Sequence, residues 1–540
     1  MAAKIFQGGT AGGNWNNNAN WVGGAFAIAG DTVTFSANAN PCIVNVASAC
    51  LSIDFTGWTG TTTMTATLVI ANAAASGNVT LVAGMGTISG SAALDVRGTS
   101  TTLISNGKTW GAALTLNTTS AITLNDNWTV SNTLAFNGNN PIINGFTIFI
   151  GGNLLMNSSP TSVTGTTKYE ITSNCTITSA NTSNSFSTQS FVINSSGTVT
   201  FPSGSGGINF ASSATLTSVW TYTAGTMVFG TGLVRFGAAV GISFTITTGS
   251  SCIFYNLSLY TTIGSTGTIT LAANLYLTNI FGGAGNTQTL TVNGFKIYVG
   301  YAAQIGSIAW NNSGSSTMTG TTVIEISGTA GTGTWTDTTA PTFKNDIIFN
   351  TTGTFDISST GLKYNTGTIT YTAGTVTHTG TLGISGSCTL NTAGITWNTI
   401  NITGAPTITL NSLWTVTGVT TTTTSVIFAG TSGWSLATFN CATAGVTVTF
   451  KNGVTYTTTS AVSMLGSSVS HMIFTSDHAT LRAIWTVLNN GIATQSMVYV
   501  DGTRIDSSLG QTIWSFGGTL TSTLNWGATG QLYTVSRPFA

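Results

Sequence analysis

One eight-residue segment of the sequence occurs twice. The segment Asn144–Gly151 (NGFTIFIG) returns 149 residues later as Asn293–Gly300 (NGFKIYVG). An Ile-Thr-Leu segment precedes each copy, at residues 122–124 and 269–271, and a third stands at 408–410. A chain built by reiteration usually forms an elongated stack of supersecondary units, in which each unit buries its apolar face against the next. The repeat therefore predicts a stacked fold.

The spacing of apolar residues indicates strands and turns. They alternate singly with Thr, Ser or Asn over short stretches that end at Gly or Asn-Gly. Between the two copies, alternate positions keep their apolar volume, whereas Thr147 between them is replaced by Lys296. Alternate residues of a strand point to opposite faces, so the apolar set is predicted to face a core. This set is Phe146, Ile148 and Ile150, matched by Phe295, Ile297 and Val299.

Two architectures can carry such strands, a β-solenoid with turns of about 20 to 25 residues and a row of β-sandwich domains. Sandwich domains are usually joined by linkers and carry charged outer faces. This chain of 540 residues has only 7 prolines and is 4% charged, against 41% hydrophobic. We therefore predict an all-β, right-handed parallel β-solenoid (β-helix), with an atypical N-terminal cap and a distinct C-terminal β module.

Both ends of the chain differ from the repeated middle. Residues 1–40 hold Trp15 and Trp21 but have no later copy, which is expected of a segment that caps an open end or attaches the chain. Residues 41–440 are predicted to form the solenoid. Residues 441–540 hold much of the charge and are predicted to be a cap, an assembly module or a receptor-facing module.

The charge balance excludes several classes of partner. Lys plus Arg and Asp plus Glu number 12 each, so the formal net charge is zero. Nucleic acids select clustered Lys and Arg, so we expect no nucleic-acid binding. No stretch approaches the roughly 20 apolar residues of a spanning helix, and no membrane insertion is expected. Zero net charge favours self-association, which suits a protein that works as an assembly.

Candidate catalytic groups are few. Glu170 and Glu325 occupy the same place in two repeats, which indicates a structural role. Asp501 and Asp506 form the densest acidic cluster, but lone surface carboxylates are common and catalytic pairs are rare. His378 stands where the other repeat has Phe229, which predicts a packed or half-exposed ring. We therefore predict no catalytic residue, no metal site, no cofactor and no enzymatic activity.

Tryptophan and cysteine residues are the remaining candidates for binding or for chemistry. Flat aromatic faces stack on sugar rings and anchor interfaces, so the tryptophans outside the repeats are candidates for recognition. They are Trp434, Trp485, Trp514 and Trp526. The six cysteines lack the spacing of a zinc site and are predicted to be buried free thiols, with a Cys42–Cys50 disulfide as the alternative.

Three segments carry a resemblance to known proteins. The first is Gly12–Trp21 with Gly30–Phe35, the second is the phrase FYNLSL at 254–259 before Ile-Thr-Leu, and the third runs from Ile505 to Trp526. They resemble segments of large solenoid proteins of tailed bacteriophages and of repeat-rich bacterial adhesins. The resemblance implies a fibre, spike or appendage on the virion surface. Such proteins are commonly trimeric, so a homotrimer is expected, and the resemblance supplies no catalytic residue.

The resemblance and the composition together predict a function. We expect a structural fibre or appendage that projects from a phage particle, is held by other virion proteins through a terminal segment and contacts host surface glycans. The first ten residues show no signal-peptide core, so synthesis in the host cytoplasm and a place on the virion surface are expected. The alternatives are an extracellular or cell-surface adhesin or self-assembling filament, and a tailspike that depolymerises polysaccharide.

Overall fold

The fold is a stack of β-strands in two units. The computed structural model is nearly all β, with 1% helix, and forms a parallel β-solenoid of about 18 turns. This confirms the predicted solenoid, and its right-handedness remains a prediction. The units are residues 1–260 with 267–275, and residues 261–266 with 276–540. The structure describes residues 2–9, 13–71, 76–118, 120–137, 140–157, 162–180, 184–187, 190–204, 207–212, 218–238, 242–261, 266–284, 289–301, 304–311, 317–337, 341–358, 362–488, 494–507, 513–516, 518–523 and 526–529.

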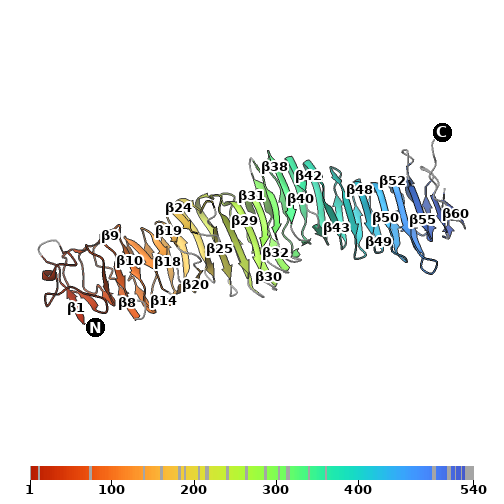
Figure 1. Cartoon of the computed structure of the whole chain (residues 1–540). Coiled ribbons are helices and arrows are strands. Elements are labelled where there is room, and N and C mark those ends of the chain that lie inside the picture. Colours follow the sequence, from red (N-terminus) through yellow and green to blue (C-terminus); the bar gives the residue numbers. More distant parts are fainter. Residues whose placement is uncertain are drawn as a thin grey trace. The chain divides into compact units, whose positions relative to one another are not determined.

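Strands of the first unit form three faces, and each strand pairs in parallel with the strand one turn later (Figure 1). Face A contains β1 (Ala3–Phe6), β2 (Thr32–Phe35), β5 (Ser52–Asp54), β8 (Ser76–Thr80), β11 (Ser100–Ile104), β14 (Ala121–Leu124), β17 (Ile142–Gly145), β20 (Ser162–Gly165), β23 (Ser185–Ser187), β25 (Gly207–Ser212), β27 (Leu233–Ala238) and part of β29 (Ile253–Thr261). Face B contains β12 (Thr109–Trp110), β15 (Trp128–Val130), β18 (Thr147–Ile150), β21 (Lys168–Ile171), β24 (Phe191–Thr200), β26 (Trp220–Val228), β28 (Ser243–Thr247) and β30 (Thr266–Leu271). Face C contains β4 (Ser48–Cys50), β7 (Leu68–Ile70), β10 (Ala93–Val96), β13 (Ala113–Leu116), β16 (Leu134–Phe136), β19 (Leu154–Met156), β22 (Cys175–Ser179) and the second halves of β24 and β26. A small separate sheet consists of β3 (Cys42–Val44), β6 (Thr62–Met64) and β9 (Ile88–Gly90).

The second unit has three faces of the same kind. Face D contains parts of β31 (Leu275–Ala284), β40 (Ile347–Ile357), β42 (Gly367–His378), β48 (Trp414–Thr422), β50 (Trp434–Cys441) and β52 (Thr455–Leu465), with β35 (Ser307–Asn311), β38 (Thr332–Asp337), β45 (Ile395–Trp397), β54 (Ala483–Val487) and β57 (Ile505–Asp506). Face E contains the first halves of β31, β40 and β42 with β33 (Ile297–Tyr301), β37 (Ile324–Ile326), β44 (Cys388–Asn391), β47 (Thr407–Leu410), β49 (Val426–Gly430), β51 (Thr447–Phe450), β53 (Met472–Ser476), β56 (Val500–Thr503) and β59 (Leu520–Thr521). Face F contains the second halves of β48, β50 and β52 with β32 (Thr289–Gly294), β36 (Thr317–Thr319), β39 (Thr342–Phe343), β41 (Leu362–Tyr364), β43 (Thr381–Ile384), β46 (Thr399–Ile402), β55 (Thr494–Val498), β58 (Ile513–Phe516) and β60 (Trp526–Thr529). A short antiparallel strand, β34 (Gln304–Ile305), pairs with β33.

The core is built from side chains stacked in register from turn to turn. Leu94, Leu114, Leu134 and Leu154 pair in succession on face C, 20 residues apart, and all are buried. Apolar residues at one depth of every turn thus form a continuous column, which keeps water away from the parallel ladder. Turn length varies along the chain: 20 residues separate Leu390 from its partner Leu410, and 28 separate Met472 from its partner Val500. The structure is consistent with the predicted distinct C-terminal β module.

The two NGF copies correct one prediction. Their later apolar residues, such as Ile148 and Ile297, are buried as expected, but Phe146 and Phe295 are 52% and 53% exposed. Each phenylalanine follows a glycine at positive φ, Gly145 or Gly294, at the corner between two strands. The strand alternation used for the prediction does not continue through a corner, because the turn rotates the next side chain out of the pleat. Both corners therefore present a phenyl ring to solvent.

The sequence repeat does not match a whole number of turns. In the first unit, the Ile-Thr-Leu segment 122–124 lies in β14 on face A, whereas 269–271 lies in β30 on face B. Strand β30 pairs with β28, and the column runs back to β15, which follows β14 in the chain. The two Ile-Thr-Leu segments consequently lie on different faces of the first unit.

The predicted N-terminal cap is an aromatic plug. Phe6 lies 5.1 Å from Trp21 and 5.8 Å from Trp58, measured between ring centroids, and Trp15 stacks at 6.0 Å. The indole of Trp21 donates a hydrogen bond to the Trp15 carbonyl at 2.7 Å, beside the short 3-10 helix η1 (Asn18–Asn20). These large rings fill the core at the N-terminal end of the first unit.

All six cysteines are buried free thiols, as predicted, so the alternative Cys42–Cys50 disulfide is not formed. Within the described ranges, no helix has both the length and the hydrophobicity that crossing a bilayer requires.

Candidate functional site

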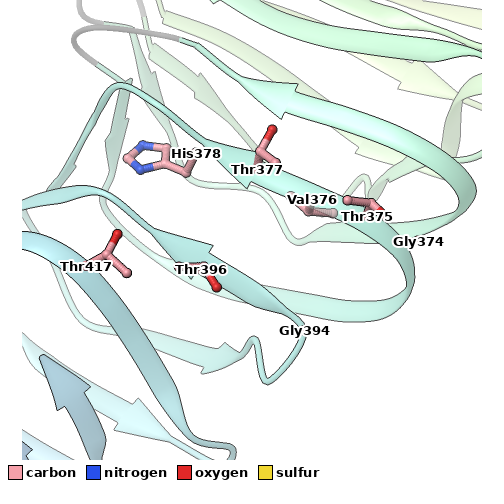
Figure 2. A pocket seen from close by; sticks show the side chains of 8 residues that line it. All are labelled: Gly374, Thr375, Val376, Thr377, His378, Gly394, Thr396 and Thr417. Carbon is pink, nitrogen blue, oxygen red and sulfur yellow. The ribbon is translucent and has the colours of Figure 1, made fainter.

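A hollow of about 480 Å³ opens on face D of the second unit. Figure 2 shows the side chains around it, which come from three neighbouring strands, β42, β45 and β48. The hollow is lined by Gly374, Thr375, Val376, Thr377, His378, Gly394, Thr396 and Thr417. We call it the threonine groove. Its lining offers hydroxyl groups and backbone, and it contains no Lys, Arg, Asp or Glu.

Strand register places two threonines of the groove, Thr377 and Thr396, in one row, which Thr415 continues beyond the lining. Thr377 pairs with Thr396, and Thr396 pairs with Thr415, so one threonine follows another at each turn. Neighbouring strands lie about 4.8 Å apart, which sets the spacing of the row. The Thr377 hydroxyl donates to Asp356 Oδ1 at 2.9 Å, and the Thr417 hydroxyl donates to the Trp397 carbonyl at 3.3 Å. Each of these hydroxyls gives its single proton to the protein, so its oxygen lone pairs are oriented as acceptors before any ligand arrives.

A tyrosine hydroxyl stabilises the corner beside the threonine groove through a hydrogen bond. The Tyr371 hydroxyl donates to the Gly374 carbonyl at 2.7 Å, and a Cβ added at Gly394 would come within 2.0 Å of the Tyr371 ring. Gly394 therefore leaves room for the ring, and Gly374 turns the corner at positive φ. The other copy of the segment YTAGT makes the same contact in the first unit, where the Tyr222 hydroxyl donates to the Gly225 carbonyl at 2.6 Å.

His378 is a packed, neutral ring, and packing is one of the two placements that its alignment with Phe229 predicted. It is 5% exposed, and its centroid lies 5.1 Å from that of Trp397. Burial lowers its pKa to about 4, against the opposing effect of the Asp356 carboxylate. Nδ1 accepts the Asn398 backbone N–H at 3.0 Å, which places the remaining proton on Nε2. Among the described residues, this Nε2 has no hydrogen-bond partner.

Sequence reasoning missed the threonine groove, although a signal was available. The equivalent corner of the first repeat has Val228 and Phe229 where the second has Thr377 and His378. A hydroxyl and an imidazole thus replace two apolar groups at one corner of a duplicated frame. Because threonine is abundant throughout the chain, only the difference between the copies distinguishes these residues.

The repeated glutamates have a structural role. Glu170 accepts from Lys168 Nζ at 2.9 Å and from Asn194 Nδ2 at 3.0 Å. Glu325 accepts from Lys296 and from Asn350, both at 2.9 Å. Burial would raise the pKa of Glu170, but the hydrogen bonds from Asn194 and Lys168 outweigh it and lower the pKa. The Glu170 carboxylate is therefore kept ionised, and both glutamates join neighbouring turns through their hydrogen bonds.

The C-terminal acidic cluster includes a histidine–carboxylate pair. Nδ1 of His471 lies 2.9 Å from Asp501 Oδ1, and the same oxygen accepts the Thr519 backbone N–H at 2.6 Å. Asp506 lies in β57 on another face of the unit. Within the described part of the chain, no group of three or more His, Cys, Asp or Glu side chains is placed to hold a metal ion.

The four tryptophans proposed for recognition divide into two pairs. Trp434 and Trp485 are fully buried, and Trp434 contacts Phe428 at 4.5 Å and Tyr456 at 4.9 Å between centroids. They fill the core and present no face to a ligand at the surface, because the strand alternation turns both inward. The side chains of Trp514 and Trp526 lie outside the described residues.

The structure is a parallel β-solenoid with a groove that is lined by threonine hydroxyls and has no Lys, Arg, Asp or Glu in its lining. Comparison with known proteins adds no relative: no family model, no curated protein and no solved structure matches the chain.

Proposed function

We propose that the protein is a structural fibre or appendage of a bacteriophage particle, which projects from the virion surface and contacts host glycans without cleaving them. The observation that carries the proposal is the parallel stacking of successive turns in the described part of each unit, with buried columns such as Leu94 to Leu154. Each turn hydrogen-bonds to the next through backbone groups, which resists bending and proteolysis. Stiffness of this kind suits a mechanical projection.

The virion location rests on the resemblance of the terminal segments to phage solenoid proteins, and an adhesin or extracellular filament is the alternative. Immunogold electron microscopy with antibodies to the purified chain separates the two. Label on particles from a clarified lysate, at projections from tail or capsid, is the expected result. Label that stays with the cell envelope, with clean particles, would contradict the virion proposal and favour the adhesin.

We infer that three copies of the chain work together, and that the threonine groove is a glycan contact. Three copies would multiply a weak contact through effective concentration. The groove suits a neutral saccharide, because its lining combines hydroxyl groups with backbone and has no charged side chain. In the first unit the equivalent Val228 offers no hydroxyl, so one contact per chain is expected.

Removing two groove hydroxyls should weaken this contact. Thr377→Val with Thr396→Val keeps the side-chain shape but deletes two hydrogen-bonding groups, which should reduce affinity roughly tenfold. Ligand-observed NMR titration of cellohexaose and maltohexaose against the intact chain measures the change. Thr421→Val on face F is the matched control and should bind like the wild type. Equal binding by wild type and double variant would assign any saccharide contact to another surface.

A further inference from the structure

The N-terminal cap carries a concentration of exposed apolar side chains. Ile5, Val22, Phe26 and Ile28 are 39%, 50%, 38% and 61% exposed. They are four of the 17 large apolar residues that are exposed in the described part of the chain, although they come from fewer than thirty residues. We call this set the cap surface. Monomeric proteins rarely leave such side chains gathered in one place, and those that do usually bind something there.

The cap surface is held in place by hydrogen bonds at both ends. Residues 21–30 read WVGGAFAIAG and contain no polar side chain other than the Trp21 indole. The Val22 N–H donates to the Ile5 carbonyl at 3.0 Å, which fixes the start of the segment beside β1. Asp31 fixes its end by accepting the Ala2 N–H at 3.0 Å and the Ile28 N–H at 3.2 Å.

The local packing leaves the outer side of this segment open. Trp21 and Ala27 are buried, so they anchor the segment to the plug. A Cβ added at Gly23 or Gly24 would meet no atom within 4 Å. The exposed side chains therefore lie on an ordered segment, and the solvent around them is not displaced by neighbouring parts of the cap.

The charge balance of the cap favours a second copy as the partner of the cap surface. Lys4 is the charged residue of β1, Asp31 directly follows the segment 21–30, and the two interact with each other. Burial would raise the pKa of Asp31, but the Ala2 and Ile28 amides and Lys4 lower it, so the carboxylate stays ionised opposite Lys4. A second copy brings the same compensated pair and the same apolar side chains. Self-contact thus meets no net like-charge repulsion, as is also true of the whole chain with its zero formal charge.

We propose that the cap surface is the self-association surface of this protein, through which copies of the chain bind one another by burying Val22, Phe26 and Ile28. The inference deepens the homotrimer part of the proposed function and does not depend on the virion location. Contact of this kind buries apolar area, so it should weaken on cooling and respond little to salt.

Oligomeric state tests the proposal directly. Analytical ultracentrifugation of the intact chain at micromolar concentration should give a species of three times 55.2 kDa. The double variant Phe26→Asp, Ile28→Asp should sediment as the single chain, because each copy then adds two like charges to the contact. The matched control is Phe146→Asp, a similarly exposed phenylalanine of the same unit, which should remain associated. Circular dichroism of each variant checks that the solenoid is folded.

A monomeric wild type, an associated Phe26→Asp, Ile28→Asp variant or a dissociated Phe146→Asp variant would overturn the proposal. A dimer that the double variant dissociates would support the cap surface but contradict the homotrimer. Failure of the virion labelling experiment leaves this test unaffected, so the two proposals fail separately.

Discussion

Replacing Trp434 by alanine is expected to lower the free energy of unfolding of the second unit by about 3–5 kcal/mol, the usual cost of removing a buried tryptophan. The ring is 1% exposed and lies among Phe428, Phe439, Phe450 and Tyr456. Alanine would leave a cavity in a column that has turns above and below it, so the neighbours cannot collapse into it freely. Urea unfolding followed by circular dichroism measures the loss.

The matched control is Phe295→Ala in the same unit. Phe295 is half exposed at its corner, and its truncation should cost below about 1 kcal/mol because little buried area is lost. Comparable losses for the two variants would contradict the assignment of Trp434 to the core and Phe295 to the surface. A large loss for Trp434→Ala alone would also mean that any weakened glycan binding by that variant reports unfolding and not a lost contact.

The second large effect is a loss of stability in acid at His378. Its folded pKa of about 4 lies below the roughly 6.5 of an unfolded histidine, so the unfolded chain binds the extra proton between these values. The stabilisation from this group is fully present above pH 6.5 and is lost as the pH falls toward 4. The difference corresponds to about 3 kcal/mol across that window.

A phenylalanine at this position isolates the contribution of the histidine. His378→Phe introduces the residue that the first repeat carries as Phe229, and its phenyl ring can still pack on Trp397. The variant should lose about 1 kcal/mol at pH 7, because the Asn398 N–H loses its acceptor, but its stability should fall less in acid. Urea midpoints at pH 7 and pH 4 give the comparison. Parallel pH profiles for variant and wild type would show that His378 does not titrate as derived.

Local sequence patterns predicted much of the fold. Alternation over short stretches identified strands, and Asn-Gly identified the corners, because both depend on residues within a few positions of each other. The same reasoning placed Ile148 and Ile297 in the core correctly and Phe146 and Phe295 wrongly. The error arose at the corner glycine, where the backbone leaves the strand and the period of two no longer applies.

The candidate site was less predictable. The threonine groove joins strands β42, β45 and β48, and the register between turns decides which threonines share a row. No local pattern separates Thr377 or Thr396 from the many other threonines of this chain. Trp434 and Trp485 were candidates because they lie outside the repeats, but position outside a repeat says nothing about which face of a strand a residue occupies.

The amino-acid sequence by itself determined that this chain is repetitive, almost uncharged and made of strands that stack in parallel, because these properties follow from composition and from spacing over a few residues. The tertiary structure alone decided that the repeated Ile-Thr-Leu segments of the first unit lie on different faces, that the corner phenylalanines meet solvent and that apolar side chains gather on the N-terminal cap. The physical reason is that turn length and register set the angular position of every side chain, and both depend on contacts between residues 20 or more positions apart.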